Sequence, residues 1–172
     1  TKLRESEQSP LLNRVVQGQY PPGSTIKPFL GLGGLHQKFI TPDSVVPDPG
    51  WYSIPGDDRR YRDWTLKIRG AGHADFVDIG LAIAESCDTY FYDLAYRMGI
   101  EKMAEVLFPF GLGRVTGIDT TGEQPGILPN SAWKQAALGE AWYPGETISA
   151  GIGQGYMLTT PIQLAQATLI LA

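Results

Sequence analysis

Tyr20-Pro21-Pro22-Gly23-Ser24-Thr25-Ile26-Lys27-Pro28-Phe29 is the stretch around which the rest of this sequence can be interpreted. Its Pro-Pro-Gly sequence ends any preceding element, and the apolar pattern resumes afterwards, so a helix is predicted to begin at Ser24. Lys27 follows three positions later, which places the two side chains on one helical face with Cβ atoms about 5–6 Å apart. The stretch therefore predicts a serine and a lysine side by side at the start of a helix.

This pair has two interpretations. A serine hydroxyl is a weak nucleophile until a neighbouring base activates it, and a lysine is such a base only where its surroundings favour the neutral amine. Ser24 and Lys27 would then be nucleophile and base. Alternatively, Ser24 caps the helix and Lys27 is solvated, because S-x-x-K is a short pattern. The pair alone leaves both interpretations open.

Composition narrows the class of protein. The chain has 172 residues, of which 42% are hydrophobic, so it can form one domain or a large part of one. Its formal net charge of −4 gives no overall basic character, which argues against a nucleic-acid partner. No apolar run approaches the roughly 18 residues of a membrane span. A single cysteine, Cys87, rules out a disulfide within the chain.

Apolar periodicity predicts a mainly helical chain. The first helix should continue to Leu35, and its three glycines indicate close packing against a neighbouring element. Frequent proline and glycine predict loops with short strands over residues 41–72. Helices are expected over residues 75–85, 90–98 and 101–108, from a cap at Asn130, and from a capping box at Thr160.

A mixed-charge patch, Asp57-Asp58-Arg59-Arg60-Tyr61-Arg62-Asp63-Trp64, lies inside the predicted loop region. Mixed charges normally pair on a solvated surface, which is one interpretation. The other is a docking surface for a partner.

The opening stretch, together with Ser9-Pro10-Leu11-Leu12-Asn13-Arg14, resembles the active-site serine segment of class B penicillin-binding proteins, the D,D-transpeptidases that cross-link peptidoglycan. Later segments resemble the elongation-type subgroup, penicillin-binding protein 2. They are Pro49-Gly50-Trp51, Tyr61-Arg62-Asp63-Trp64, Ser86-Cys87-Asp88 with the residues after it, Thr116-Gly117-Ile118-Asp119 and Gly151-Ile152-Gly153-Gln154-Gly155. The resemblance covers nearly the whole chain.

The resemblance implies an α/β (α+β) fold of the penicillin-binding transpeptidase and serine β-lactamase type, with an antiparallel sheet and helices. This chain would hold mainly the helical portion and an incomplete sheet. Residues 1–172 would then be a partial transpeptidase domain, with an approach segment at 1–20 and a helical region at 21–172 that carries the first and second catalytic motifs.

The resemblance also assigns catalytic roles. Ser24 would attack the substrate carbonyl, Lys27 would accept its proton, and Ser86 of the second motif would help protonate the leaving amine. Asp88 stands where many relatives have asparagine. A charged carboxylate beside Lys27 would stabilise the protonated amine and oppose its role as a base, unless Asp88 turns away or bonds elsewhere.

The family's third motif, K-[ST]-G, is not found in this sequence. In the family it lies on a strand beside the serine, binds the substrate carboxylate and supplies one oxyanion-hole amide. Losing one such donor typically lowers the rate by about 10²–10³-fold. We therefore expect the 172-residue chain alone to be a poor catalyst, and its substrate-binding residues stay open.

The implied function is cross-linking of peptidoglycan stem peptides through an acyl-enzyme on Ser24, with acylation by β-lactam antibiotics, during cell elongation. No cofactor is required for it. The implied partners are a glycosyltransferase and other membrane proteins of the elongation machinery. The implied place is the periplasmic face of the bacterial inner membrane, with an N-terminal anchor outside this sequence.

Two other functions stay open. One is a serine β-lactamase, which needs a base for a deacylating water, and no E-x-x-x-N element is found. The other is a catalytically silent sensor or scaffold that binds peptidoglycan or β-lactams.

Asp48, Asp63, His73 and Cys87 are residue types that hold zinc, and they raise the question of a structural zinc site. Their spacing matches no compact zinc motif. The alternative is a pair of loop aspartates, a hydrogen-bonded histidine and a thiol that only packs in the core.

Overall fold

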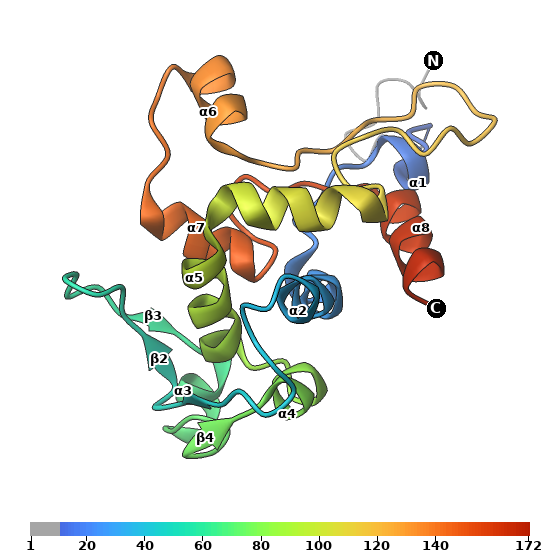
Figure 1. The fold of residues 1–172 in the computed structure, drawn as a ribbon. Coiled ribbons are helices and arrows are strands. Elements are labelled where there is room, and N and C mark those ends of the chain that lie inside the picture. The colour runs from blue at the N-terminus through green and yellow to red at the C-terminus, as the bar shows by residue number, and fades with distance from the viewer. Residues whose placement is uncertain (1–10) are drawn as a thin grey trace.

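The computed structural model describes residues 11–172, so Ser9, Pro10 and the first half of the predicted approach segment lie outside the described residues. The described chain is mixed helix and strand, with helices predominant (Figure 1). Its elements are α1 (Arg14–Gln17), η1 (Gly23–Ile26), α2 (Lys27–His36), β1 (Val46–Pro47), β2 (Trp51–Tyr52), β3 (Tyr61–Arg62), α3 (Trp64–Arg69), β4 (Phe76–Val77), α4 (Ile79–Ala84), α5 (Asp88–Leu107), η2 (Phe108–Phe110), α6 (Ser131–Leu138), α7 (Pro144–Gly151) and α8 (Pro161–Leu171).

Helix α5 is the centre of the molecule, and α2 and α7 pack against it. Its N-terminus is capped by Cys87, whose Sγ accepts a hydrogen bond from the Tyr90 amide. At Gly99 the backbone leaves the helical region with φ of 71°, and the helix changes direction there (Figure 1). The two helices predicted over 90–98 and 101–108 are therefore confirmed as two segments joined at a glycine that tolerates positive φ.

Helix α2 lies directly against α5, and its glycines explain how. A Cβ atom on Gly33 would overlap Cγ1 of Val106, and one on Gly34 would lie 3.0 Å from Leu94 Cδ1. The predicted close packing is confirmed. The predicted start of this helix at Ser24 was wrong by three residues, because Ser24 belongs to a 3₁₀ turn and the α-helix begins at Lys27.

The strands form two small antiparallel sheets. β1 pairs with β4, placing Val46 opposite Val77, and β2 pairs with β3, placing Tyr52 opposite Tyr61. The loop prediction for residues 41–72 missed helix α3. The helix predicted over 75–85 was too long, because β4 takes its first residues and Asp78 caps a shorter α4.

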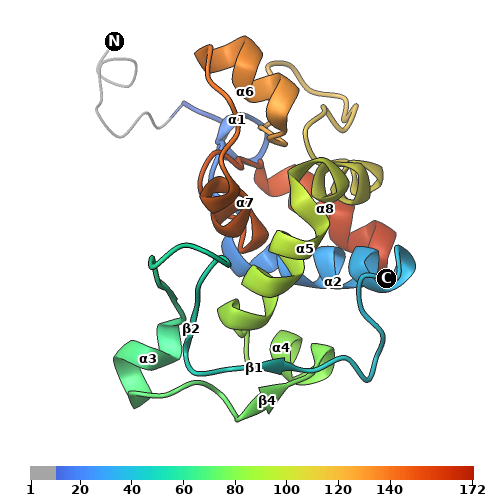
Figure 2. The ribbon, with the colours of Figure 1, turned by 60° about the vertical axis from the view of Figure 1, so that its left-hand side comes forward.

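The C-terminal third contains the two predicted capped helices. The Asn130 side chain accepts from the Trp133 amide at the start of α6, and Thr160 forms the capping box of α8. Helix α7 was not predicted, because its sequence is rich in glycine and small residues. Figure 2 shows α7 beside α5, with α8 on the other side of the upper part of α5.

Buried apolar side chains form two groups. The larger group surrounds the first segment of α5, and the smaller one joins Ile26 and Phe29 to Leu107 and Met157. Within residues 11–172, no helix has both the length and the apolar character needed to cross a bilayer.

Candidate active site

Ser24 is exposed on the 3₁₀ turn, and its loop is held by a second glycine-rich segment. Gly23 has φ of 58°, and its amide donates to the Gly153 carbonyl at 2.9 Å. Residue 153 has no room for a side chain, because a Cβ there would overlap the Gly23 backbone. From the sequence, residues 151–155 were named only as a segment that resembles the family, and this contact, which holds the loop that presents Ser24, was missed.

Lys27 is almost fully buried and joins the first motif to the second. Its Nζ donates to the Ser86 carbonyl at 2.8 Å and the Ser86 Oγ at 3.2 Å, and it forms an ion pair with Asp88 Oδ1 at 2.6 Å. These contacts use its three N–H donors. Among the described residues, no hydrogen bond joins Lys27 to the Ser24 hydroxyl.

Asp88 is not turned away from Lys27. The role of Lys27 as a base was expected to require that Asp88 turn away or bond elsewhere, and neither is the case in this conformation. Burial raises the pKa of Asp88, and the charge of Lys27 acts in the opposite direction, with a net rise.

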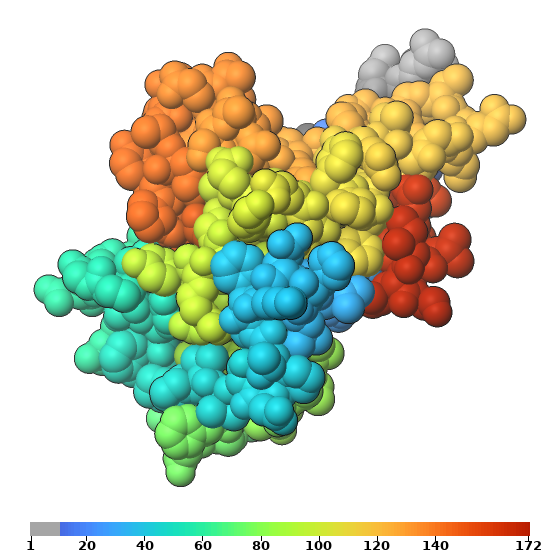
Figure 3. All heavy atoms as spheres, in the orientation of Figure 1, coloured from blue at the N-terminus to red at the C-terminus, as the bar shows by residue number. Residues whose placement is uncertain are grey.

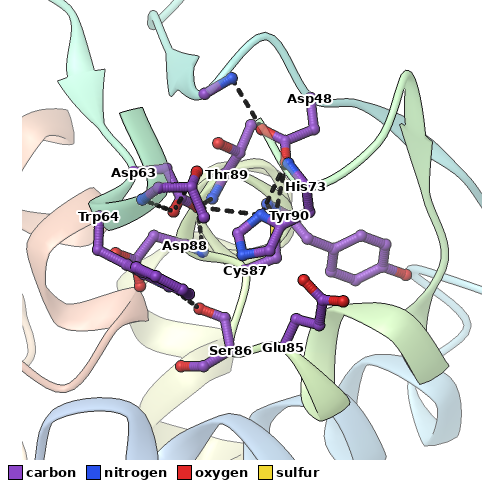
Figure 4. A network of polar contacts seen from close by, with 12 residues as sticks. Asp48, Asp63, Trp64, His73, Glu85, Ser86, Cys87, Asp88, Thr89 and Tyr90 are labelled. Atoms are coloured by element: carbon purple, nitrogen blue, oxygen red, sulfur yellow. Dashed lines mark hydrogen bonds and ion pairs between the residues drawn. The ribbon is translucent and has the colours of Figure 1, made fainter. Parts of the chain in front are cut away.

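Ser86 adopts an uncommon backbone conformation with φ of 56°, which a residue other than glycine rarely adopts. The indole Nε1 of Trp64 donates to its carbonyl at 3.3 Å, which helps to hold the turn (Figure 4). Strained residues of this kind concentrate at functional sites. The geometry points the Ser86 hydroxyl at Lys27, and no sequence signal announced the strain.

Asp63 caps two helices at once. Its Oδ1 accepts from the Thr65 amide at the start of α3, and its Oδ2 accepts from the amides of Asp88 and Thr89 at the start of α5, at 2.6 and 3.1 Å (Figure 4). Sequence reasoning named Asp63 only as a metal ligand. The structure shows that it also fixes the backbone from which Asp88 reaches Lys27.

Asp48, Asp63, His73 and Cys87 come together beneath the second motif. Their ligand atoms all lie within 4.8 Å of one another, although the residues are far apart in sequence. His73 Nδ1 lies 2.9 Å from Asp48 Oδ2, and Figure 4 shows the imidazole directed toward both aspartates. This proximity confirms that the four residues are neighbours, which their spacing could not show.

The donor set fits a metal such as zinc. Among residues 11–172, the buried His73 Nε2 has no hydrogen-bond partner. Burial raises the pKa of the Cys87 thiol above its ordinary range, so without a cation the thiol stays protonated. Two carboxylates, an imidazole and a thiolate are all zinc ligands.

Comparison with known proteins identifies the family. The family description "Penicillin binding protein transpeptidase domain" matches residues 1–172. The chain belongs to this penicillin-binding transpeptidase family. The predicted family and fold class are thereby confirmed.

Individual relatives of the chain support this family assignment. It is 46% identical over 172 residues to peptidoglycan D,D-transpeptidase MrdA of Acinetobacter baumannii, covering 100% of the chain and 25% of that relative. It is similar to Pseudomonas aeruginosa PBP2 in complex with WCK 5153, with a TM-score of 0.93, 47% identity, and coverage of 99% of this chain and 36% of that one.

It is also similar to Helicobacter pylori PBP2 in complex with MreC, with a TM-score of 0.86 and 36% identity, covering 95% and 29% of the two chains. The chain spans about a quarter of the length of the curated relatives it matches.

Proposed function

We propose that the protein containing this chain is a peptidoglycan D,D-transpeptidase with Ser24 as nucleophile and Lys27 as base. The observation that carries the proposal is the buried Lys27 amine, which lies one turn after Ser24 and, in this conformation, donates to the Ser86 Oγ and to Asp88. A lysine held between a serine and a second polar motif is the arrangement that nucleophilic acyl transfer needs. The relatives named as D,D-transpeptidases support the assignment.

In the proposed reaction, the Ser24 Oγ bonds to the carbonyl carbon of the penultimate D-Ala of a stem peptide and gives its proton to a neutral Lys27. The C–N bond then breaks, and the leaving D-Ala amine takes a proton through Ser86, whose Oγ lies 3.2 Å from Lys27 Nζ. An amine from a neighbouring stem peptide attacks the acyl-enzyme and forms the new amide bond, and the proton that it loses passes through Lys27 to the departing Ser24 Oγ, which restores the hydroxyl. Catalytic hydrogen bonds often tighten only when substrate binds, so Ser24 need not bond to Lys27 beforehand.

We extend the proposal to the setting of the enzyme. The H. pylori relative is described in complex with MreC, which supports an elongation complex for this protein too. The glycosyltransferase partner, acylation by β-lactams and a periplasmic, membrane-anchored location belong to the same proposal.

The proposal is tested on the complete protein that contains this chain. Stem peptide and an amine acceptor should give a cross-linked product, and Ser24→Ala should abolish it. Ser44→Ala removes an exposed loop hydroxyl that bonds to Thr41 and should leave the product unchanged. Rapid β-lactam hydrolysis without cross-linking would instead indicate a β-lactamase, and binding without a covalent adduct would indicate a sensor.

We also propose that Asp48, Asp63, His73 and Cys87 hold a structural zinc ion. The orphaned buried His73 Nε2 and the approach of all four ligand atoms within 4.8 Å support it. Metal analysis of the purified complete protein should give one zinc per chain, and Cys87→Ser should lose it. Asp78→Asn, at a helix cap outside the cluster, should retain it. Absence of stoichiometric metal in the unsubstituted protein ends this proposal.

A further inference from the structure

A cavity of about 400 Å³ lies between the tip of the β2–β3 hairpin and the start of α7. Arg59 lines it from the hairpin, and Tyr143, Ser149 and Tyr156 line it from the other side. Figure 1 shows the hairpin projecting from the body on the side where α7 begins, and Figure 3 shows it on the surface below the segment that leads into α7. The cavity has one cationic wall and one largely aromatic wall.

The aromatic wall is built around a buried lysine. Lys134 Nζ donates to Glu146 Oε1 at 2.6 Å and to the Ala141 carbonyl at 2.8 Å. The same ammonium lies 4.6 Å from the ring centroid of Tyr143 and 5.8 Å from that of Tyr156. The buried amine therefore lies against both rings, and Tyr143 keeps a large exposed fraction of 59% toward solvent.

The charged groups that line the cavity differ in whether they have an ion-pair partner. The only carboxylate that lines it, Glu146, is paired with Lys134, and its second oxygen accepts from the Tyr143 amide at 2.8 Å. The Arg59 guanidinium stacks over the Tyr61 ring at 4.8 Å and forms no ion pair with any residue in 11–172. The cavity therefore offers an oriented guanidinium without a carboxylate partner, which suits a carboxylate ligand.

Along the chain, each wall of the cavity leads to a segment that contacts one of the two motifs. From Arg59, the hairpin leads through Tyr61 to Trp64, whose indole donates to the Ser86 carbonyl. From Ser149, helix α7 leads to Gly153, whose carbonyl accepts from the Gly23 amide beside Ser24. A ligand in the cavity would thus lie against the two segments that hold both catalytic motifs.

We propose that this cavity is a subsite for a carboxylate-bearing residue of the stem peptide, with Arg59 binding the carboxylate and Tyr143 and Tyr156 packing against its aliphatic part. The proposal rests on the transpeptidase function proposed above and adds a substrate feature to it. Arg59 is a specificity residue in this account, and it takes no part in the acyl transfer.

The test measures binding of two synthetic stem peptides that end in D-Ala-D-Ala, one with a free side-chain carboxylate at its third residue and one with that group amidated. Calorimetry on the complete protein carrying Ser24→Ala avoids turnover. The carboxylate peptide should bind at least about tenfold more tightly, because a charged hydrogen bond is lost in the amide. Adding Arg59→Ala should reduce this ratio to near one.

Arg60→Ala is the matched control, because Arg60 is on the same hairpin but stacks over Trp51 and does not line the cavity. It should keep the ratio, and circular dichroism should show both variants folded. Equal binding of the two peptides to the parent protein, retention of the ratio in Arg59→Ala, or equal loss in both variants would each overturn the subsite. Acylation of Ser24 in the unsubstituted protein tests the transpeptidase function separately, so the two failures are distinguishable.

Discussion

Lys27 Nζ and Asp88 Oδ1 lie 2.6 Å apart and tie the start of α2 to the start of α5. The exposed fractions of their side chains are 2% and 14%, so this ion pair is largely removed from water. This ion pair and the contacts of Lys27 with the Ser86 carbonyl and hydroxyl therefore join the first sequence motif to the second.

Asp88→Ala should destabilise the complete transpeptidase domain by about 3 kcal/mol, because it leaves a buried ammonium without its counter-ion. Asp88→Asn should cost less, since an amide oxygen can still accept from Lys27. Urea unfolding gives both values. Glu85→Ala breaks the exposed pair with Arg69 and should cost less than about 1 kcal/mol. An Asp88→Ala effect as small as this control would contradict the account.

Gly33→Ala should destabilise the domain by about 1–3 kcal/mol, because the added methyl meets the branched Val106 side chain. Gly31→Ala is the control. Its methyl would meet the ends of the flexible Ile79 and Ile83 side chains, at 3.0 and 3.6 Å from their Cδ1 atoms, and it gains helix propensity of about 1 kcal/mol. Thermal unfolding should separate the two, and Val106→Ala should partly rescue Gly33→Ala. Equal effects at both glycines would refute the close approach of α2 and α5.

Lys134→Met should lower the melting temperature and loosen the segment before α7. It removes the ammonium from Glu146 and from the Ala141 carbonyl while keeping an unbranched side chain. Hydrogen exchange at residues 139–146 should rise. Lys102→Met, which breaks a surface pair with Glu105, should change neither measurement. Unchanged exchange in Lys134→Met would show that the buried amine does not hold this segment.

Glu123 should contribute to stability in a pH-dependent way. Burial raises the pKa of Glu123, but the hydrogen bonds from Thr116 and the Gly117 amide together outweigh this and lower the pKa below its ordinary value of 4.5. A lowered pKa in the folded state gives stability that is present above pH 4.5 and is lost as the pH falls through the folded-state value.

Glu123→Gln should therefore melt below the parent protein at pH 7, and the gap should narrow as the pH falls below about 4.5. Melting curves of the parent protein and of Glu123→Gln, recorded at pH 7 and below pH 4.5, measure this gap. The exposed Glu101→Gln variant serves for comparison. A gap that widens in acid has the wrong sign for this account.

Local signals predicted much of the fold. Asn130 and Thr160 cap the helices that their patterns indicated, and Gly99 divides α5 where a break was expected. Helix α7 was missed because its glycines and small residues have low intrinsic propensity, and tertiary packing against α5 supplies the stability. Helix α3 was missed among the prolines and glycines around it, although Asp63 gives it a standard N-cap.

The candidate site was likewise predicted in part from the sequence. Ser24, Lys27 and Ser86 were named from motifs, and the structure brings Lys27 and Ser86 into contact. The sequence left open whether Asp88 pairs with Lys27 or turns away, since a motif does not say which way a side chain points, and the structure shows the pair. The Gly23–Gly153 contact also depends on residues distant in sequence, and only the fold brings them together.

The proposed role of Ser24 as nucleophile predicts that a labelled penicillin forms a covalent adduct with Ser24 on the complete protein. Peptide mapping by mass spectrometry should place the penicilloyl group on Ser24 alone, and Ser24→Ala should carry no label. Labelling of Ser24→Ala, or an adduct on another residue of the parent protein, would contradict the account.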